Sequence, residues 1–282
     1  MFPVFRDRKE KIKIIRRVIF NQKGGVGKTT ITCNLAAISA VYGKKTLVID
    51  LDQQCNSTHY LLGRGTNDEE YTISDYFEEL LRIKFRRKNF DTYIHKTPFS
   101  NLHIIPSHPD LGDLHGKLET RYKMFKLRDS LDSLTQFDYI YIDTPPALNF
   151  FTRSALIASD SCLIPFDCDS FSRSALYSLM ENVNEIQQDH NSNLEIEGII
   201  VNQFQQRAKF PAKIVSEMIA DGLPVIDTYL SSSIKIRESH DKALPMAYMD
   251  ARHKLTRQFE ELYCKLNSSS DKNKNTSKGK SR

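Results

Sequence analysis

The chain has 282 residues, of which 40% are hydrophobic and 27% charged, and its formal net charge is +5. This length suits one large α/β domain, and no apolar run approaches the length of a membrane span. Charged and apolar residues alternate at the N-terminus, so we expect no secretory signal. The five cysteines form neither a CxxC pair nor a zinc-binding spacing, and we expect them to be reduced in a cytoplasmic protein.

The positive charge is concentrated at the two ends of the chain and in one internal patch. Residues 1–17 hold seven Lys or Arg against two acids, and residues 267–282 hold five against one. The internal patch is residues 82–88. Such patches suit a polyanion such as DNA, with functionless solvated charge as the alternative. We therefore expect a basic N-terminal arm at 1–17, a folded domain at 18–266, and a disordered basic tail at 267–282.

Strand and helix patterns alternate through the expected domain, which predicts an α/β fold with a mostly parallel, twisted sheet and helices on both faces. The predicted strands are residues 18–21, 46–50, 102–105, 139–142, 162–165, 198–201 and 225–229. The predicted helices are residues 29–41, 74–83, 110–134, 150–158, 172–188, 211–220 and 254–266. No internal repeat is present, so we expect one domain.

The most informative segment is Phe-Asn-Gln-Lys-Gly-Gly-Val-Gly-Lys-Thr-Thr at residues 20–30. It lies between a predicted strand and a predicted helix, where small residues let backbone N–H groups approach phosphate oxygens. Lys28 can supply positive charge to the β- and γ-phosphates, and the Thr29 hydroxyl can bind Mg²⁺. Gln22 stands where the common phosphate-binding pattern has its first glycine, and a second lysine, Lys23, follows it. The segment predicts a nucleotide-binding loop.

Two further motifs place carboxylates where predicted strands end. Asp50-Leu51-Asp52 follows the second strand, and Asp143-Thr144-Pro145-Pro146 follows the fourth. Ligands bind at the carboxyl ends of strands in open α/β sheets, and a carboxylate there suits hydrated Mg²⁺. Each carboxylate taken alone could instead cap a helix or a turn. A set of unrelated turns does not explain why all three motifs appear in the order of the family that they resemble.

These three motifs resemble those of the ParA/MinD family, the P-loop NTPases with a deviant Walker A sequence, and the resemblance extends from about residue 18 to 266. It implies ATP and Mg²⁺ as cofactors. It also implies that Lys23 reaches the partner's nucleotide across a homodimer, that Asp52 orients the attacking water, and that Asp143 and Thr29 hold Mg²⁺. The implied catalytic residues are Lys23, Lys28 and Asp52. The implied nucleotide-binding residues are Lys23, Gly24, Gly25, Val26, Gly27, Lys28, Thr29, Thr30 and Asn202.

The chain departs from the family pattern in its second motif, where Gln53 and Cys55 replace a proline and a glycine. Two later features are less specific. The resemblance implies that Asn202 lies near the adenine, although an Asn that ends a strand and turns the chain is a comparable interpretation. It also implies that residues 234–239 lie near the base. The candidates for DNA phosphate contacts are Arg207, Lys209, Lys213, Lys235 and Arg237, although each of them taken alone is better explained as an ordinary solvated surface charge.

The resemblance implies a short ParA, because residues 1–17 are too few for a helix-turn-helix domain. Such a protein forms a homodimer with ATP, binds DNA without sequence preference, and hydrolyses ATP when a ParB-like partner stimulates it. We therefore expect a bacterial, nucleoid-associated ATPase for plasmid or chromosome partition. A MinD-like protein would need an amphipathic helix near its C-terminus, whereas residues 267–282 are polar, so we expect no membrane binding.

Three alternatives remain at this point. The first is another cargo-positioning ATPase of the same family. The second is a metabolic P-loop enzyme or a metal-centre carrier, such as one of the nitrogenase iron protein type, which would need clustered cysteines for its metal centre. The third is a regulator that binds nucleotide but hydrolyses it weakly, which the replacements at Gln53 and Cys55 leave open.

Overall fold

In this computed structural model, residues 13–63, 70–82, 87–168, 173–205 and 207–277 are described. Their strands form one seven-stranded sheet in the order β3-β4-β2-β5-β1-β6-β7. The strands are β1 (Ile15–Ile19), β2 (Thr46–Asp50), β3 (His95–Lys96), β4 (Leu102–Ile105), β5 (Tyr139–Asp143), β6 (Ser161–Asp167) and β7 (Glu195–Asn202). Every neighbouring pair is parallel except β3 and β4. The predicted α/β fold with a mostly parallel sheet is confirmed.

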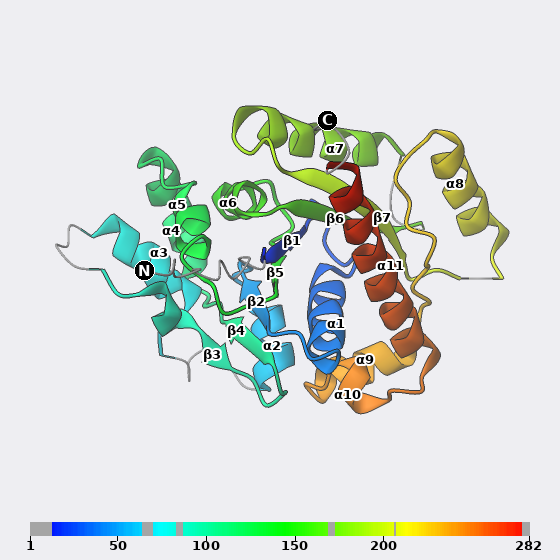
Figure 1. Ribbon diagram of the computed structural model, residues 1–282, viewed down its shortest axis with the longest axis horizontal. Coiled ribbons are helices and arrows are strands. Elements are labelled where there is room, and N and C mark those ends of the chain that lie inside the picture. Colours follow the sequence, from blue (N-terminus) through cyan, green and yellow to red (C-terminus); the bar gives the residue numbers. More distant parts are fainter. Residues whose placement is uncertain (1–12, 64–69, 83–86, 169–172, 206, 278–282) are drawn as a thin grey trace, which may run out of the picture.

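Helices lie on both sides of this sheet (Figure 1). The buried hydrophobic residues form two clusters, which we call the first core and the second core. One set of helices packs with the first core and consists of α3 (Ile73–Leu81), α4 (Leu111–Thr120), α5 (Lys126–Leu131), α6 (Phe150–Ala158), α7 (Arg173–Asp189) and α8 (Lys209–Ala220). The other set packs with the second core and consists of α1 (Lys28–Val41), α2 (Asn56–Leu62), α9 (Ile234–Asp241), α10 (Met246–Met249) and α11 (Lys254–Ser277).

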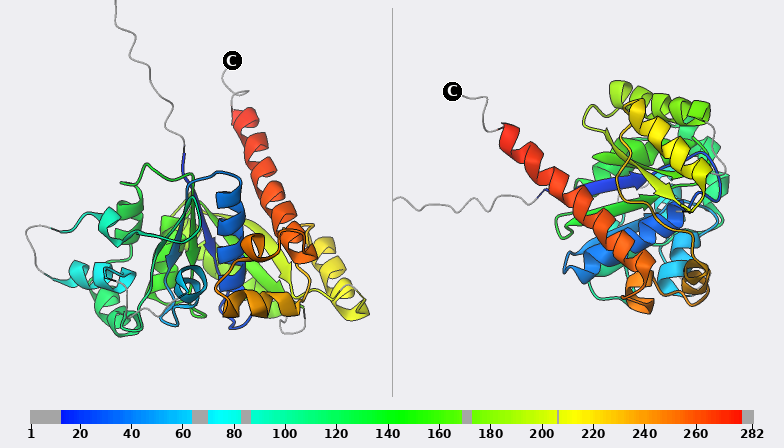
Figure 2. Two further views of the ribbon diagram at one scale, coloured as in Figure 1. Left: turned by 90° about the horizontal axis from the view of Figure 1, so that it is seen from below. Right: turned by 90° about the vertical axis from the view of Figure 1, so that its right-hand side faces the viewer.

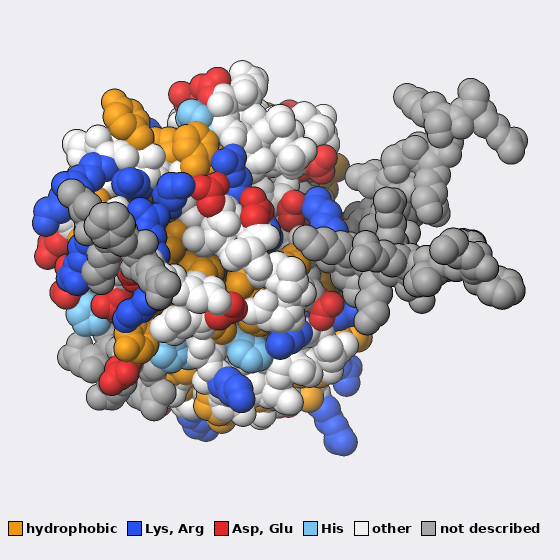
Figure 3. Space-filling view, turned by 60° about the vertical axis from the view of Figure 1, so that its left-hand side comes forward, with side chains coloured by type: hydrophobic (Ala, Val, Ile, Leu, Met, Phe, Trp, Pro, Cys, Tyr) orange, Lys and Arg blue, Asp and Glu red, His pale blue; other side chains and the backbone are white. Residues whose placement is uncertain are grey.

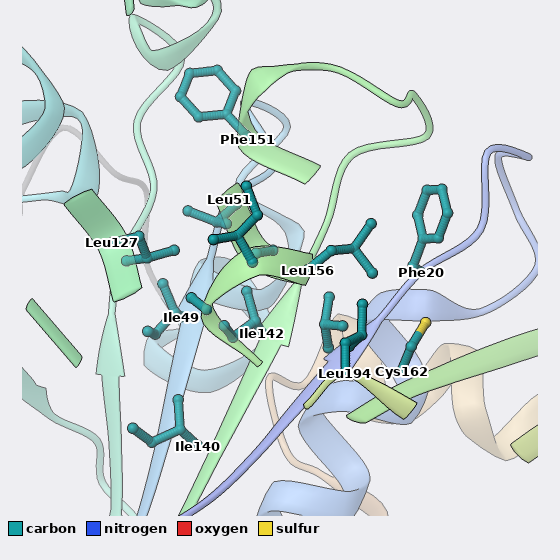
Figure 4. Packing of buried hydrophobic residues seen from close by; sticks show 14 of the residues in the cluster. Phe20, Ile49, Leu51, Leu127, Ile140, Ile142, Phe151, Leu156, Cys162 and Leu194 are labelled. Carbon is teal, nitrogen blue, oxygen red and sulfur yellow. The ribbon is translucent and has the colours of Figure 1, made fainter. Parts of the chain in front are cut away.

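Alternating residues of the central strands supply the two cores. On β5, Ile140 and Ile142 belong to the first core, while Tyr139 and Tyr141 belong to the second. Figure 4 shows part of the first core, in which Ile140 and Ile142 lie near Ile49 of the neighbouring strand β2. Both faces of β5 are buried, as expected for a strand in a parallel sheet that helices cover on two sides. The strand ends are therefore held rigidly, and the candidate site is built on them.

The predicted helix over residues 110–134 is wrong as a single element. The structure breaks it into α4 and α5, and Tyr122 between them has φ +53°. The chain ends α4 with hydrogen bonds from Tyr122 N to Glu119 O and from Lys123 N to Leu118 O. Helical spacing of apolar residues continues across the break because both helices pack on the same core.

Two strand predictions also need correction. Residues 225–229 form no strand and only a single bridge, between Ile199 and Val225. Strand β1 begins at Ile15 and not at residue 18, so residues 15–17 of the expected basic arm belong to the sheet. Arg17 is 1% exposed and its guanidinium donates to Glu197 of β7 at 2.7 and 2.8 Å. The arm therefore contributes the buried half of an ion pair, whose other half, Glu197, is partly exposed.

The last helix extends beyond its predicted end at residue 266. Its first part packs against the second core, and α11 then continues to Ser277, projecting from the body of the protein in Figure 2. Residues 267–277, which are most of the tail that composition predicts to be disordered, are therefore helical in the structure. The predicted helix ends at residues 83 and 172 lie outside the described residues, as do 278–282.

Candidate nucleotide-binding site

The loop between β1 and α1 has the backbone conformation of a phosphate-binding loop. Gly25 and Gly27 have φ values of +77° and +94°, a region that favours glycine. A Cβ added at Gly27 would lie 2.2 Å from Asn202 Nδ2, so the space there also requires glycine. Helix α1 begins at Lys28, and the first N–H groups of a helix have no partners within it. The loop therefore presents donors and a helix N-terminus to an anion.

Lys28 is held inside this loop. Its side chain is 7% exposed, and Nζ donates to Lys23 O at 2.9 Å. Burial lowers the pKa of Lys28, and the nearby carboxylates of Asp143 and Asp52 oppose that shift. The backbone of Lys23 is fixed in turn, because its N–H donates to Asn21 Oδ1 at 2.9 Å. The two lysines predicted from the sequence therefore lie at one loop, where Lys23 is half-buried.

Asp143 ends β5 beside this loop and has the environment of a metal ligand. Thr29 Oγ1 and Ser57 Oγ both donate to its Oδ2 at 2.7 Å. Its other oxygen, Oδ1, is buried without a hydrogen-bond partner among the described residues. Burial raises the pKa of Asp143, and the nearby charge of Asp52 raises it further. An unpaired carboxylate oxygen next to a hydroxyl fits a hydrated Mg²⁺, which prefers hard oxygen ligands.

Asp50 orders the loop that carries Asp52. It is wholly buried at the end of β2 and accepts from Thr58 N and Thr58 Oγ1, each at 2.8 Å, and from Asp52 N at 3.1 Å. Burial raises the pKa of Asp50, and the charge of Asp143 adds to the shift. Asp52 is 6% exposed and accepts from Gln54 N at 3.0 Å. The loop thus holds the Asp52 carboxylate close enough to influence both Lys28 and Asp143.

Sequence reasoning missed Ser57 and Thr58, which lie on α2. This helix has only seven residues and its N-cap is Cys55, with φ +56° and no side-chain cap. The left-handed conformation explains why the family pattern has glycine there. Cys55 adopts it nonetheless, with its side chain buried and Sγ donating to Gln53 O at 3.3 Å. The replacement therefore keeps the turn.

A cavity of about 300 Å³ opens beside the phosphate loop. Asn202 forms part of its wall, and Asn202 Nδ2 donates to Val26 O at 2.9 Å. The neighbouring Gln203 donates from Nε2 to Gly25 O at 3.1 Å. The cavity is lined by Gly25, Gly27, Thr30, Asn202, Gln203, Ser231, Ser232, Ser233, Ile234, Ile236, Arg237, His240, Leu255 and Phe259. The predicted loop, Asn202 and much of the segment 234–239 thus meet at one cavity.

The five candidate DNA-binding residues do not lie together. Arg207, Lys209 and Lys213 are exposed at or near α8, and Lys213 pairs with Glu217 at 3.8 Å. Lys235 is on α9, where it pairs with Glu238 at 2.9 Å, and Arg237 lines the cavity beside the phosphate loop.

The exposed residues of the patch at 82–88 include Arg82, Arg87 and Lys88, while 83–86 lie outside the described residues. Figure 3 shows Lys and Arg side chains gathered on the side of the molecule that carries α3, α4 and α5.

Comparison with known proteins identifies the family. A family model described as an AAA domain matches residues 12–196. The chromosome partitioning protein ParA of Myxococcus xanthus is 36% identical over 71% of this chain and 69% of its own length. The chromosome-partitioning ATPase Soj of Treponema pallidum is 31% identical over 87% of this chain and 94% of its own. The chain belongs to the ParA/MinD family of P-loop ATPases. It is an ATPase.

Solved structures share the fold. A putative plasmid partition protein from Borrelia burgdorferi, bound to AMPPNP, is 25% identical, with a TM-score of 0.72 over 92% of this chain and all of that one. A cobyrinic acid a,c-diamide synthase from Mycobacterium smegmatis, with bound ATP analogue and magnesium, has a TM-score of 0.77 at 20% identity, over 90% and 94% of the two chains. The second likeness concerns the fold alone, because one fold hosts many activities. Within the described residues, no helix is long and apolar enough to cross a membrane.

Proposed function

We propose that the protein is an ATP-dependent, dimerising switch for the partition of plasmid or chromosomal DNA. The observation that carries the proposal is the convergence of Lys28, Thr29, Asp52 and Asp143 at the carboxyl ends of three adjacent strands. Phosphoryl transfer to water needs mainly positioning and charge stabilisation, and these groups can supply both.

Each residue of the site has a distinct role in this proposal. The loop N–H groups and Lys28 bind the phosphates, and Thr29 and Asp143 hold Mg²⁺. Mg²⁺ held there would neutralise phosphate charge. Asp52 orients the attacking water. Lys23 of each subunit binds the nucleotide of the other, so that ATP closes the dimer and hydrolysis opens it.

The cavity beside the loop takes the adenine. Its walls combine the apolar Ile236, Leu255 and Phe259 with the polar Asn202, which is typical of a site for a planar base. Its position against Gly25 and Gly27 is where the base of a nucleotide held by this loop would lie. The nearby Arg237 then belongs to the nucleotide site, so we give the DNA-binding role to the exposed residues at 207, 209, 213 and 235.

Partition requires that the ATP-bound dimer hold DNA and that a ParB-like partner trigger its release. The support for this step is the chain's similarity to ParA and Soj proteins over most of its length and the exposed basic residues. DNA held through such residues without sequence readout is released by salt, because counterions replace the phosphate contacts.

The test is the variant Asp52→Asn, which keeps an acceptor for Gln54 N and nearly the same volume but removes the charge. It should bind ATP and dimerise, while hydrolysis falls about 10²–10⁴-fold, as loss of a positioned acid–base group does. It should also stay on non-specific DNA longer than the unmodified protein at matched ATP, with retention that declines across a salt series.

Asp113→Asn is the matched control, since Asp113 is an exposed carboxylate on α4. It should behave like the unmodified protein in both assays. Unchanged hydrolysis in Asp52→Asn would make Asp52 a turn residue. Normal hydrolysis together with no DNA retention in any variant would leave the ATPase intact and refute the partition switch.

A further inference from the structure

His240 connects two parts of the site that the nucleotide itself would also connect. It lies on α9 and lines the cavity beside the phosphate loop. Its Nε2 is 2.9 Å from Thr30 Oγ1, in the first turn of α1. Its ring stacks on Tyr60 of α2, with ring centroids 3.8 Å apart and an angle of 20° between the planes. One side chain therefore contacts α1 and α2 while forming part of the cavity wall.

Tyr60, the member of the stacked pair on α2, is held in place by contacts with α9 and α1. The Tyr60 hydroxyl is within 2.5 Å of Ser239 Oγ and accepts from Asn34 Nδ2 at 3.1 Å. Tyr60 is 1% exposed, so its ring has no room to move unless its neighbours move. Burial lowers the pKa of His240 to about 4, so the ring is neutral at physiological pH and the stack carries no charge.

Helix α2 also reaches the metal-binding carboxylate. Ser57 and Tyr60 are three residues apart and therefore share one face of the helix. Ser57 Oγ donates to Asp143 Oδ2 at 2.7 Å, and the next residue, Thr58, holds Asp50. A displacement of Tyr60 thus moves the helix that positions Asp143. Contacts run from the cavity through His240, Tyr60 and Ser57 to Asp143.

We propose that the stacked rings of Tyr60 and His240 couple the presence of a base in the cavity to the alignment of Asp143 for Mg²⁺. A base that packs against α9 fixes His240, the stack fixes α2, and Ser57 then holds Asp143. Both aromatic residues are positioning residues, because they act through Ser57. The inference rests on the proposed nucleotide site and adds a link between its base and metal ends.

Such a link is a coupling free energy, so Mg²⁺ should strengthen binding of a ligand with a base more than the binding of the phosphates alone. The ligands are ADP and inorganic pyrophosphate, each titrated by calorimetry into the purified protein with Mg²⁺ and with EDTA. In His240→Ala, the factor by which Mg²⁺ strengthens ADP binding should fall about tenfold, within the usual range of coupling. The factor for pyrophosphate should be unchanged. Complexation of Mg²⁺ by each free ligand cancels when variant and unmodified protein are compared.

Two further variants sharpen the test. His240→Phe keeps a ring on Tyr60 and loses the contact with Thr30. The factor by which Mg²⁺ strengthens ADP binding should therefore stay within about twofold of its value in the unmodified protein. His59→Ala, an exposed position on the same helix α2, is the matched control and should change nothing. Thermal unfolding of all variants checks that they are folded.

Three results would overturn the proposal. In His240→Ala, Mg²⁺ could strengthen ADP binding as much as in the unmodified protein, or its effect on pyrophosphate binding could fall equally. In His240→Phe, the effect of Mg²⁺ on ADP binding could fall as much as in His240→Ala. Failure of the proposed nucleotide site, on which the inference rests, gives a different result, because the unmodified protein would then not bind ADP under either condition.

Discussion

Gly27→Ala tests whether the phosphate loop and Asn202 are packed as the structure has them. Gly27 has φ +94°, and a Cβ there would lie 2.2 Å from Asn202 Nδ2 and 3.3 Å from its Cγ. The substitution therefore has two separate costs. One is backbone strain in a left-handed conformation, and the other is displacement of the Asn202 amide.

The two costs are of similar size. A non-glycine residue in the left-handed region costs roughly 1–2 kcal/mol. Displacing the Asn202 amide breaks its hydrogen bond to Val26 O, which contributes about 1 kcal/mol. Gly27→Ala should therefore lower the free energy of unfolding by about 2–3 kcal/mol, and in an Asn202→Ala background by only about 1–2 kcal/mol. The difference is a coupling energy of about 1 kcal/mol.

Urea unfolding of the four proteins of this cycle measures both numbers. Circular dichroism is the suitable signal because the chain has no tryptophan. A fluorescent ADP analogue, titrated in parallel, should bind to Asn202→Ala more weakly than to the unmodified protein and not at all to Gly27→Ala. Equal costs of Gly27→Ala in the two backgrounds would refute the contact, and a fully stable Gly27→Ala would refute the loop conformation as well.

Three further predictions follow, the first from the proposed function and the other two from the structure. Lys23→Ala should bind ADP but fail to dimerise in sedimentation with a non-hydrolysable ATP analogue, and an intact dimer would make Lys23 a local loop charge. Glu197→Ala should lower the free energy of unfolding by about 3–5 kcal/mol by leaving the buried Arg17 without its charged partner, and adding Arg17→Met should recover most of the loss. The pKa of His240 is lowered from 6.5 to about 4 in the folded protein. As pH falls through that interval, His240 becomes protonated in the unfolded protein before it does in the folded protein, so stability is lost. His240→Phe should flatten the acid side of the stability profile between these values, and identical profiles would show that His240 is not buried in its neutral form.

The sequence allowed prediction of the parts of the site that lie at strand ends. Apolar runs predict buried parallel strands, and parallel strands bring their carboxyl ends to one edge of the sheet. Asp50, Asp52 and Asp143 each follow such a run, so their proximity required no knowledge of the tertiary structure. The same reasoning located the glycine loop, because glycines between a strand and a helix have few other uses at this spacing.

The residues that sequence reasoning missed are those brought in by short helices. Helix α9 has only eight residues and few apolar positions, and its main local signal is Ser233, whose side chain caps Lys235 N. Helix α2 follows a cysteine in a left-handed conformation, which no propensity favours. Neither helix is stable in isolation, so packing decides that they form. Ser57, Tyr60 and His240 reach the site only as a result of that packing.

The two departures from the family pattern at Gln53 and Cys55 have a physical interpretation that bears on the alternative of a weakly hydrolysing regulator. In the proposed mechanism hydrolysis requires that the Asp52 carboxylate be fixed, and its fixation depends on hydrogen bonds from Gln54 N and between Asp52 N and Asp50. Neither bond involves the side chain at position 53 or 55. Cys55 supplies the left-handed turn at a cost of roughly 1–2 kcal/mol, which stability elsewhere offsets. The departures therefore affect the stability of the turn and leave in place the carboxylate that we propose to position water, which favours an active switch over a passive nucleotide binder.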